Sequence, residues 1–156
     1  MGLRQPVNGA GRKTETEVKL GTRGVTMIRL GFPDLEIGRA VHAPSEAVWD
    51  LLTDTVRWTE WGPSVLAVEC VGRYIRKGSR GRVRTALGIT LPFLVTEWED
   101  GRRWRWRVAG IRATGHRVEP RGRSSCLLLF EVPLFAAPYL VVCKVALDRI
   151  AALLND

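Results

Sequence analysis

The stretch from residue 40 to residue 65 constrains the fold most, because it carries two short helix signals between two strand-like runs. Val48, Leu51 and Leu52 recur at the spacing of one helical face, which predicts a short amphipathic helix. Pro44 precedes them, and proline is well suited to a first helical turn because its missing N–H has no partner there anyway. We therefore expect the first helix to begin near Pro44.

A second and shorter helix is predicted immediately afterwards. Asp54 is a good N-cap residue, and Trp58 and Trp61 follow on one face of a helix at a spacing of three. Gly62 and Pro63 are typical residues at the end of a helix. The sequence thus predicts two small helices in succession, between the first and second strands.

Most of the remaining chain shows the period of two that is typical of strands with one buried face. After Pro138 the period changes to that of a helix, and its length is sufficient to cross a sheet. Strands are predicted at residues 35–41, 65–71, 82–87, 91–98 and 126–132, with two more that flank Gly110, and the long helix at residues 138–154.

Several short motifs follow one another in an order that resembles a known superfamily. They are Ala43-Pro44, Val48-Trp49, Asp54, the segment 58–61 with Pro63, GSRGRV at 78–83, VTEWE at 95–99, GRRWRW at 101–106, and His116-Arg117. Together they resemble the START-like, polyketide cyclase/dehydrase (SRPBCC, Bet v 1-like) superfamily over residues 34–154. The resemblance implies an α+β helix-grip fold: a strongly bent antiparallel sheet of about seven strands wrapped around a long C-terminal helix. It also implies a hydrophobic cavity, but not one particular activity.

The net charge of +8 is unevenly distributed along the chain. Residues 1–30 contain six Arg and Lys against two Glu, a net of +4, and few large apolar side chains. Such a segment buries too little surface to order itself. We therefore expect a flexible basic tail at residues 1–33 and one ligand-binding domain at residues 34–156. With half of the charge in the tail, a nucleic-acid partner is not favoured.

Asp100-Gly101 is the strongest hairpin signal in the sequence, and a two-residue turn there sets the register of the flanking strands. In that register Glu97 lies opposite Trp104, and one face collects Phe93, Val95, Glu97, Trp104, Trp106 and Val108. The other face collects Arg103, Arg105 and Arg107. Three arginines cannot share a dry core, so the first face is expected to point inward and the arginines into solvent.

Glu97 and His116 are the candidate polar groups of the inward face. Glu97 could orient a ligand or carry a proton; alternatively it lies near the end of the sheet and reaches water beside Arg102 or Arg103. A three-residue loop at 110–112 would place His116 opposite Trp106 and facing the cavity. A neutral imidazole there could exchange a hydrogen bond with a ligand, although a lone strand histidine is also common as a structural group.

Other motifs that would indicate specific chemistry are missing. The sequence has no Walker A loop, GxGxxG fingerprint, HExxH, GxSxG elbow or zinc-type Cys/His cluster. We therefore expect no cofactor and no metal. Cys70, Cys126 and Cys143 fall in apolar patterns, and the chain shows neither a signal peptide nor a membrane span, which favours a cytoplasmic protein. The oligomeric state is left open.

Two functions from different classes remain. The first is a binding module that holds a hydrophobic or aromatic small molecule between the sheet and the last helix. The second is an aromatase or cyclase that folds a poly-β-ketone chain and assists aldol closure by general acid/base catalysis, with His116 and Glu97 as weak candidates. Binding is favoured because no motif fixes the polar groups that catalysis needs. The predicted ligand-binding residues are Phe93, Val95, Glu97, Trp104, Trp106, His116 and Tyr139.

Overall fold

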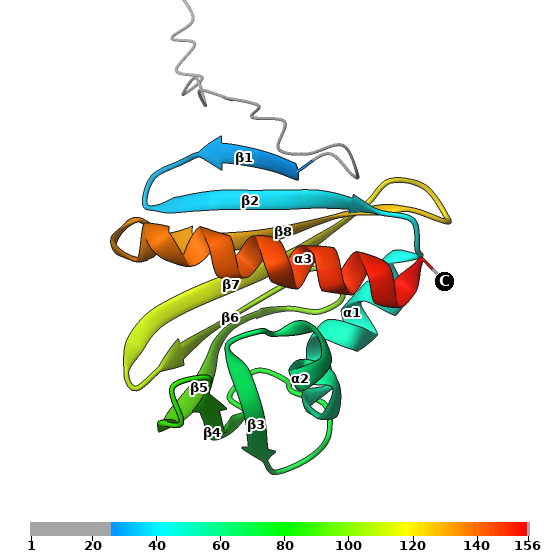
Figure 1. Cartoon of the computed structure of the whole chain (residues 1–156). Coiled ribbons are helices and arrows are strands. Elements are labelled where there is room, and N and C mark those ends of the chain that lie inside the picture. Colours follow the sequence, from blue (N-terminus) through cyan, green and yellow to red (C-terminus); the bar gives the residue numbers. More distant parts are fainter. Residues whose placement is uncertain (1–25, 156) are drawn as a thin grey trace, which may run out of the picture.

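The computed structural model describes residues 26–155, in which eight strands form one antiparallel sheet (Figure 1). The strands are Thr26–Leu30 (β1), Asp34–Val41 (β2), Val65–Cys70 (β3), Arg80–Thr85 (β4), Thr90–Glu99 (β5), Arg103–Val108 (β6), Ile111–Pro120 (β7) and Cys126–Pro133 (β8). The helices are Ser45–Thr53 (α1), Trp58–Trp61 (α2) and Leu140–Leu154 (α3), with 3₁₀ segments at Thr55–Arg57 (η1) and Leu134–Tyr139 (η2).

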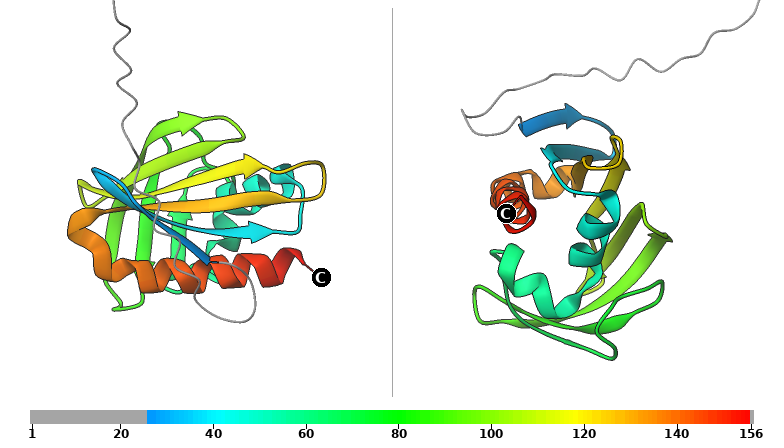
Figure 2. Two further views of the ribbon diagram at one scale, coloured as in Figure 1. Left: turned by 90° about the horizontal axis from the view of Figure 1, so that it is seen from above. Right: turned by 90° about the vertical axis from the view of Figure 1, so that its right-hand side faces the viewer.

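The sheet has the strand order β1-β2-β8-β7-β6-β5-β4-β3 and bends strongly around its helices. Figure 2 shows α3 end-on, held in the concave side of the sheet, with α1 and α2 beside it. One stripe of α3 is buried, consisting of Cys143, Ala146, Leu147, Ile150 and Ala151. Their spacing is that of a single helical face packed against a core. The predicted α+β helix-grip fold is confirmed.

The sheet has one strand more than the sequence predicted. Strand β1 pairs along β2 from Thr26 opposite Arg39 to Leu30 opposite Leu35, and it lies in the range that we predicted as a tail. Thr26 is buried and Ile28 packs against the core, so this short segment does bury apolar surface. Residues 1–25 of the predicted tail lie outside the described residues.

Deleting residues 1–30 is therefore expected to destabilise the protein, whereas deleting residues 1–25 serves as the control that leaves β1 in place. Loss of β1 removes the pairing on one side of β2 and the contacts of Ile28, and we expect the melting temperature to fall by about 2–4 °C for each kcal/mol of unfolding free energy that is lost. Differential scanning calorimetry of the two truncations would measure this. Equal melting temperatures would show that β1 adds no stability.

The two predicted helices are confirmed, with the N-cap and the stop where they were expected. The Asp54 carboxylate accepts a hydrogen bond from the backbone N–H of Val56 at 3.2 Å, which caps η1. It is also held by Arg73, whose hydrogen bonds lower the pKa of Asp54. The indoles of Trp58 and Trp61 donate to backbone carbonyls of α1, which ties the two short helices together.

The hairpin between β5 and β6 has a different register from the predicted one. The loop contains three residues, 100–102, with Gly101 at a φ of +70°, and Glu99 pairs with Arg103. Trp98 therefore lies opposite Trp104 and Glu97 opposite Arg105, until an irregularity between Val95 and Glu97 shifts the pairing again. The predicted position of Glu97 on the inward face is wrong. Trp98 takes that face instead and packs on Trp49, with ring centroids 5.2 Å apart.

The outer face of the sheet contains a buried ionic cluster where we predicted solvated arginines. Arg105 is fully buried, and it pairs with Asp34 at 2.9 Å and with Glu131 at 3.0 Å. Arg103 binds Glu131 and also Glu97, at 2.7 and 2.8 Å. Arg107 is exposed as predicted. Arg103 and Arg105 are not solvated because β2 and β8 place the carboxylates of Asp34 and Glu131 beside them.

The cluster also depends on a glycine. Gly115 lies opposite both Arg105 and Glu131 in the two flanking strand pairs, and a Cβ atom there would collide with both side chains. Burial would raise the pKa of Asp34, but hydrogen bonds from Arg112 and Arg105 outweigh it and lower the pKa.

No helix in the described part of the chain is long and apolar enough to cross a membrane.

Candidate functional site

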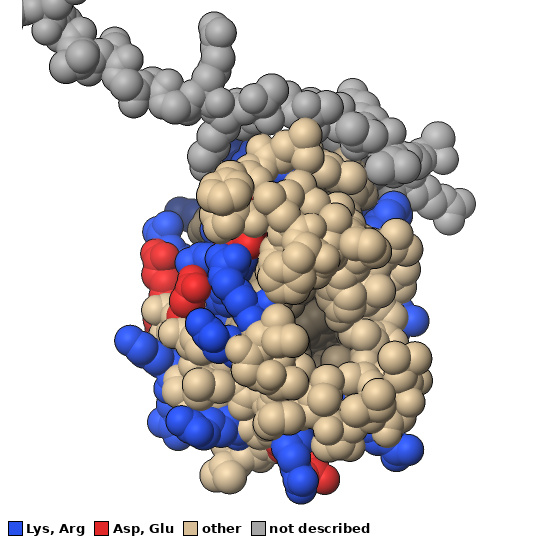
Figure 3. All heavy atoms as spheres, turned by 90° about the vertical axis from the view of Figure 1, so that its left-hand side faces the viewer, with Lys and Arg blue, Asp and Glu red and all other residues tan. Residues whose placement is uncertain are grey.

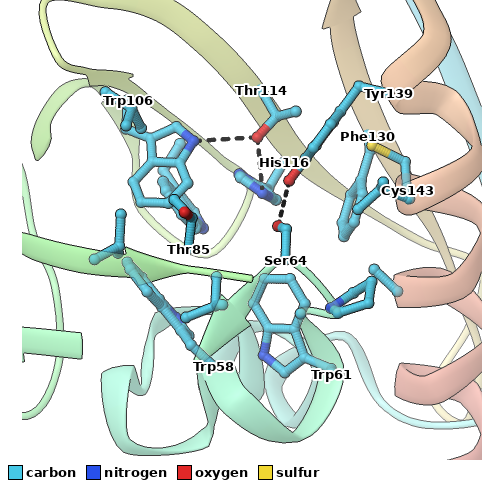
Figure 4. A pocket seen from close by; sticks show the side chains of 18 residues that line it. Trp58, Trp61, Ser64, Thr85, Trp106, Thr114, His116, Phe130, Tyr139 and Cys143 are labelled. Atoms are coloured by element: carbon cyan, nitrogen blue, oxygen red, sulfur yellow. Dashed lines mark hydrogen bonds between the residues drawn. The ribbon is translucent and has the colours of Figure 1, made fainter. Parts of the chain in front are cut away.

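A pocket lies between the concave face of the sheet and the first turns of α3, with a cavity volume of about 110 Å³. The strands contribute the floor, α2 and the loop after it contribute one wall, and α3 covers the top (Figure 4). The lining is mainly apolar and aromatic, and consists of Trp58, Trp61, Gly62, Pro63, Ser64, Val65, Val83, Thr85, Trp104, Trp106, Val108, Thr114, His116, Phe130, Tyr139, Val142, Cys143 and Ala146.

A stack of rings from β6, β7 and α2 forms the floor and continues into the adjoining wall. Trp58 and Trp104 are almost parallel with centroids 5.6 Å apart, and Trp104 stacks in turn on His116 at 4.0 Å. Trp106 meets Trp58 and Trp104 edge-on, and Phe130 meets His116 edge-on at 4.8 Å. Such contacts stabilise rigid aromatic surfaces beyond the burial of area alone. The pocket therefore offers a preformed surface that suits flat apolar molecules.

His116 is the one ionisable side chain in the floor. It is buried, and desolvation, followed by the nearby charge of Arg105, lowers its pKa to about 3. The imidazole is therefore neutral at pH 7. Thr114 links it to Trp106: the Trp106 indole N–H donates to the threonine oxygen at 3.1 Å, and this hydroxyl lies 3.5 Å from His116 Nε2.

A hydrogen bond of 2.5 Å between the hydroxyls of Ser64 and Tyr139 joins the two sides of the pocket. Ser64 belongs to the loop between α2 and β3, and Tyr139 to the end of η2, so the bond connects segments that are 75 positions apart. Figure 4 shows Tyr139 reaching across toward Ser64 and His116. Burial raises the pKa of Tyr139, so the phenol keeps its proton at neutral pH. We refer to this contact as the Ser64–Tyr139 clasp.

Four of the seven residues that we predicted to bind ligand line this pocket: Trp104, Trp106, His116 and Tyr139. Phe93 and Val95 point to the same side of the sheet but are buried in the core and do not line the pocket. Glu97 lies on the opposite face and pairs with Arg103. It is therefore not in a position to act on anything in the pocket.

The register of His116 also differs from the prediction. The connection from β6 to β7 is a two-residue turn, and Ala109 and Gly110 both have positive φ, 50° and 76°, as such a turn requires. His116 consequently lies opposite Trp104, not opposite Trp106. It still faces inward, because an irregularity between Arg105 and Arg107 compensates for the shorter loop.

Several lining residues were missed at the level of sequence. Trp58 and Trp61 had a signal, since their spacing already placed them on one buried face of a helix. Cys143 and Ala146 had a weaker one, in the period of α3. Ser64 and Thr114 had none, because a small hydroxyl residue in a loop or strand is ordinary until its neighbours are known. Among residues 26–155, no group of three or more His, Cys, Asp and Glu side chains is placed to hold a metal ion.

The chain matches solved structures over most of its length. CalU16 from Micromonospora echinospora is 21% identical with a TM-score of 0.58, and the match covers 85% of this chain and 84% of that one. Protein NE0264 from Nitrosomonas europaea is 15% identical with a TM-score of 0.61, and the match covers 81% and 97%. BexL, a di-domain ARO/CYC protein of the BE-7585A biosynthetic pathway, is 13% identical with a TM-score of 0.62, covering 76% of this chain and 45% of BexL. At these identities the matches show the fold alone.

A search of curated proteins found no match. A family model, described as polyketide cyclase/dehydrase and lipid transport, matches residues 34–149. That range includes α1, α2, the whole floor of the pocket and most of α3. Because the match extends over well more than half of the sequence, this chain belongs to the polyketide cyclase/dehydrase and lipid transport family.

Proposed function

We propose that this protein binds a hydrophobic or aromatic small molecule in the pocket between the sheet and α3. The observation that carries the proposal is the stack of Trp58, Trp104 and His116, which leaves apolar space against the helix instead of filling it. Apolar cavities of ~150 Å³ hold benzene in other proteins. A cavity of about 110 Å³ fits one ring at most, and a larger ligand requires the Ser64–Tyr139 clasp to open.

The polar groups of the pocket favour binding over catalysis. A general base works best when its pKa is near the working pH, and a His116 pKa of about 3 is far below it. Glu97, the other candidate for proton transfer, lies across the sheet. What remains is suited to recognition: a neutral imidazole and the indole N–H of Trp104, a buried donor with no acceptor among the described residues. Both can meet an oxygen of a ligand.

The pocket is tested by two substitutions that add the same ring at different places. Val142 lines the cavity from α3, and Val142→Phe is expected to fill it and abolish binding of 2-naphthol while the fold is kept. Val95 is buried in the core, so Val95→Phe is expected to overpack it and lower stability by ~1–3 kcal/mol. Binding is measured by quenching of tryptophan emission and by calorimetry. If the parent binds no aromatic probe, the proposal fails.

The polar role of His116 is tested with a matched pair of probes. 2-Naphthol and naphthalene differ by one hydroxyl, and only the former can use the imidazole. We expect His116→Ala to weaken 2-naphthol by about 0.5–1.5 kcal/mol more than naphthalene. An equal loss of affinity for both probes would show that His116 contributes only to the shape of the pocket. Turnover of a poly-β-ketone substrate that His116→Ala abolishes would support the cyclase alternative instead.

A further inference from the structure

The connections at the two ends of the sheet differ in composition. At the end where the pocket opens, the connections β1–β2 (31–33), β4–β5 (86–89), β6–β7 (109–110) and β8–α3 (134–139) contain no charged residue. At the other end, β3–β4, β5–β6 and β7–β8 all carry charge, at Arg73, Arg76, Lys77, Asp100, Arg102, Arg121 and Arg123. Exposed turns are normally polar. The lack of charged residues in the turns at the pocket end is therefore unusual and calls for an explanation.

Large apolar side chains stand exposed on these uncharged turns or directly beside them. Phe32 is 92% exposed, Leu87 86%, Phe135 70%, Ile111 59% and Ile89 54%. We call these five residues the mouth face. Four of them lie on or beside turns that adjoin the pocket-lining residues Thr85, Val108 and Tyr139. Phe32 is next to Pro33, whose carbonyl accepts a hydrogen bond from the backbone N–H of Leu134 in the β8–α3 connection. Figure 3 shows this end of the molecule as uncharged surface around a hollow, with most of the Lys and Arg gathered to one side together with Asp and Glu, and others at the edges of the view. Apolar side chains gathered around a pocket opening, unlike ones scattered singly over the surface, indicate an interaction site.

The charged residues beside the mouth face indicate the sign of the partner's charge. Arg84 and Arg107 are exposed, lie within two residues of the β4–β5 and β6–β7 turns, and form no ion pair with a described carboxylate. Their positions favour an anionic partner. A second copy of this chain would bring arginine against arginine, which opposes association through this face.

The shape of the mouth face favours a lipid surface. Its apolar side chains sit on separate turn tips around the pocket opening, not on one continuous surface. A fluid bilayer accommodates separate tips at the level of the acyl chains while arginines meet the headgroups. We propose that the mouth face docks on the surface of an anionic lipid bilayer and opens the pocket toward the hydrocarbon. This inference goes beyond the proposed function and is tested without a pocket ligand.

The test is co-sedimentation of the full chain with vesicles of equal parts phosphatidylcholine and phosphatidylglycerol. The double variant Leu87→Asp/Ile89→Asp is expected to bind about tenfold more weakly than the parent. Phe135→Ser, in a different turn, should also weaken binding. Val71→Asp is the matched control, because Val71 is 97% exposed but lies in the β3–β4 connection at the opposite end of the sheet. The affinity of this variant for the vesicles should equal that of the parent.

The basic residues 1–25 are common to all variants, so differences between them report on the mouth face. Binding by the parent should persist in part at high salt, which screens headgroup attraction but not apolar insertion. Arg84→Gln/Arg107→Gln should lower the affinity for these vesicles but not for phosphatidylcholine alone. The proposal is overturned if Leu87→Asp/Ile89→Asp binds like the parent, or if Val71→Asp weakens binding equally. It is also overturned if sedimentation velocity without lipid shows a parent dimer that the double variant dissociates.

Discussion

Replacing Arg105 by methionine is expected to lower the free energy of unfolding by about 3–5 kcal/mol, because it removes the central cation of a buried cluster. Arg105 is fully buried and bridges Asp34 on β2 to Glu131 on β8. Without it, Glu131 keeps Arg103 and Arg117, and Asp34 keeps Arg112, but each of the two carboxylates loses one cationic partner. The effect should be evident in urea unfolding at neutral pH.

Arg107 provides the matched control for this substitution. It lies on the same strand and the same face, but it is exposed, and within residues 26–155 its guanidinium donates only to the carbonyl of Gly110. Arg107→Met should change the free energy of unfolding by no more than about 0.5 kcal/mol. Arg105→Lys should fall between the two, since lysine keeps the charge but cannot bridge two carboxylates with a fork of donors. If the two methionine variants are equally stable, the cluster contributes nothing.

The second large effect is a loss of stability in mild acid that originates in His116. The pKa of this imidazole is about 3 in the folded protein against an ordinary value of 6.5, so the unfolded chain binds a proton between these values and the folded one does not. The contribution of the neutral His116 to the free energy of unfolding is fully present above pH 6.5 and is lost progressively as the pH falls toward 3. Each pH unit within this window costs about 1.4 kcal/mol.

We therefore expect the parent to lose about 2–3 kcal/mol more than His116→Phe when the pH falls from 6.5 to 4.5. Phenylalanine keeps a ring on Trp104 and cannot titrate. His42→Gln is the control for the loss of a histidine, because His42 is exposed and does not line the pocket. Free energies of unfolding from urea titrations at the two pH values provide the comparison. Parallel pH dependences for the parent and His116→Phe would contradict a buried, neutral imidazole.

The sequence predicted those parts of the fold that depend on local signals. The N-cap at Asp54, the helix stop at Gly62 and the change of period after Pro138 each depend on residues close in the chain, and all three were found. The inward orientation of Trp104, Trp106 and His116 was also predicted, although from the wrong registers. Those predictions survived because irregularities in β5 and β6 restored the faces that the loop lengths had displaced.

The ionic cluster could not be predicted in this way. Its carboxylates, Asp34 and Glu131, come from strands whose register the sequence does not reveal, since β8 is apolar on both faces except for Glu131. When those partners are unknown, three arginines on one face of a strand predict that this face is exposed to solvent. The same reasoning misplaced Glu97, whose position depends on one extra residue in a loop. Long-range pairing decided each of these cases.

The pairing of β2 with β8 has a consequence for how the chain acquires its structure during synthesis. Asp34 pairs with Pro133 and Val41 with Cys126, so the two strands are 85 to 99 positions apart. Ordering them closes a very long loop, and contacts of this kind slow the folding of a domain. On the ribosome, β2 emerges before the segment from α1 to β7, but it has no partner on this side until β8 is made. The N-terminal hairpin β1–β2 therefore waits with one unpaired edge, while the segment from α1 to β7 can already assemble.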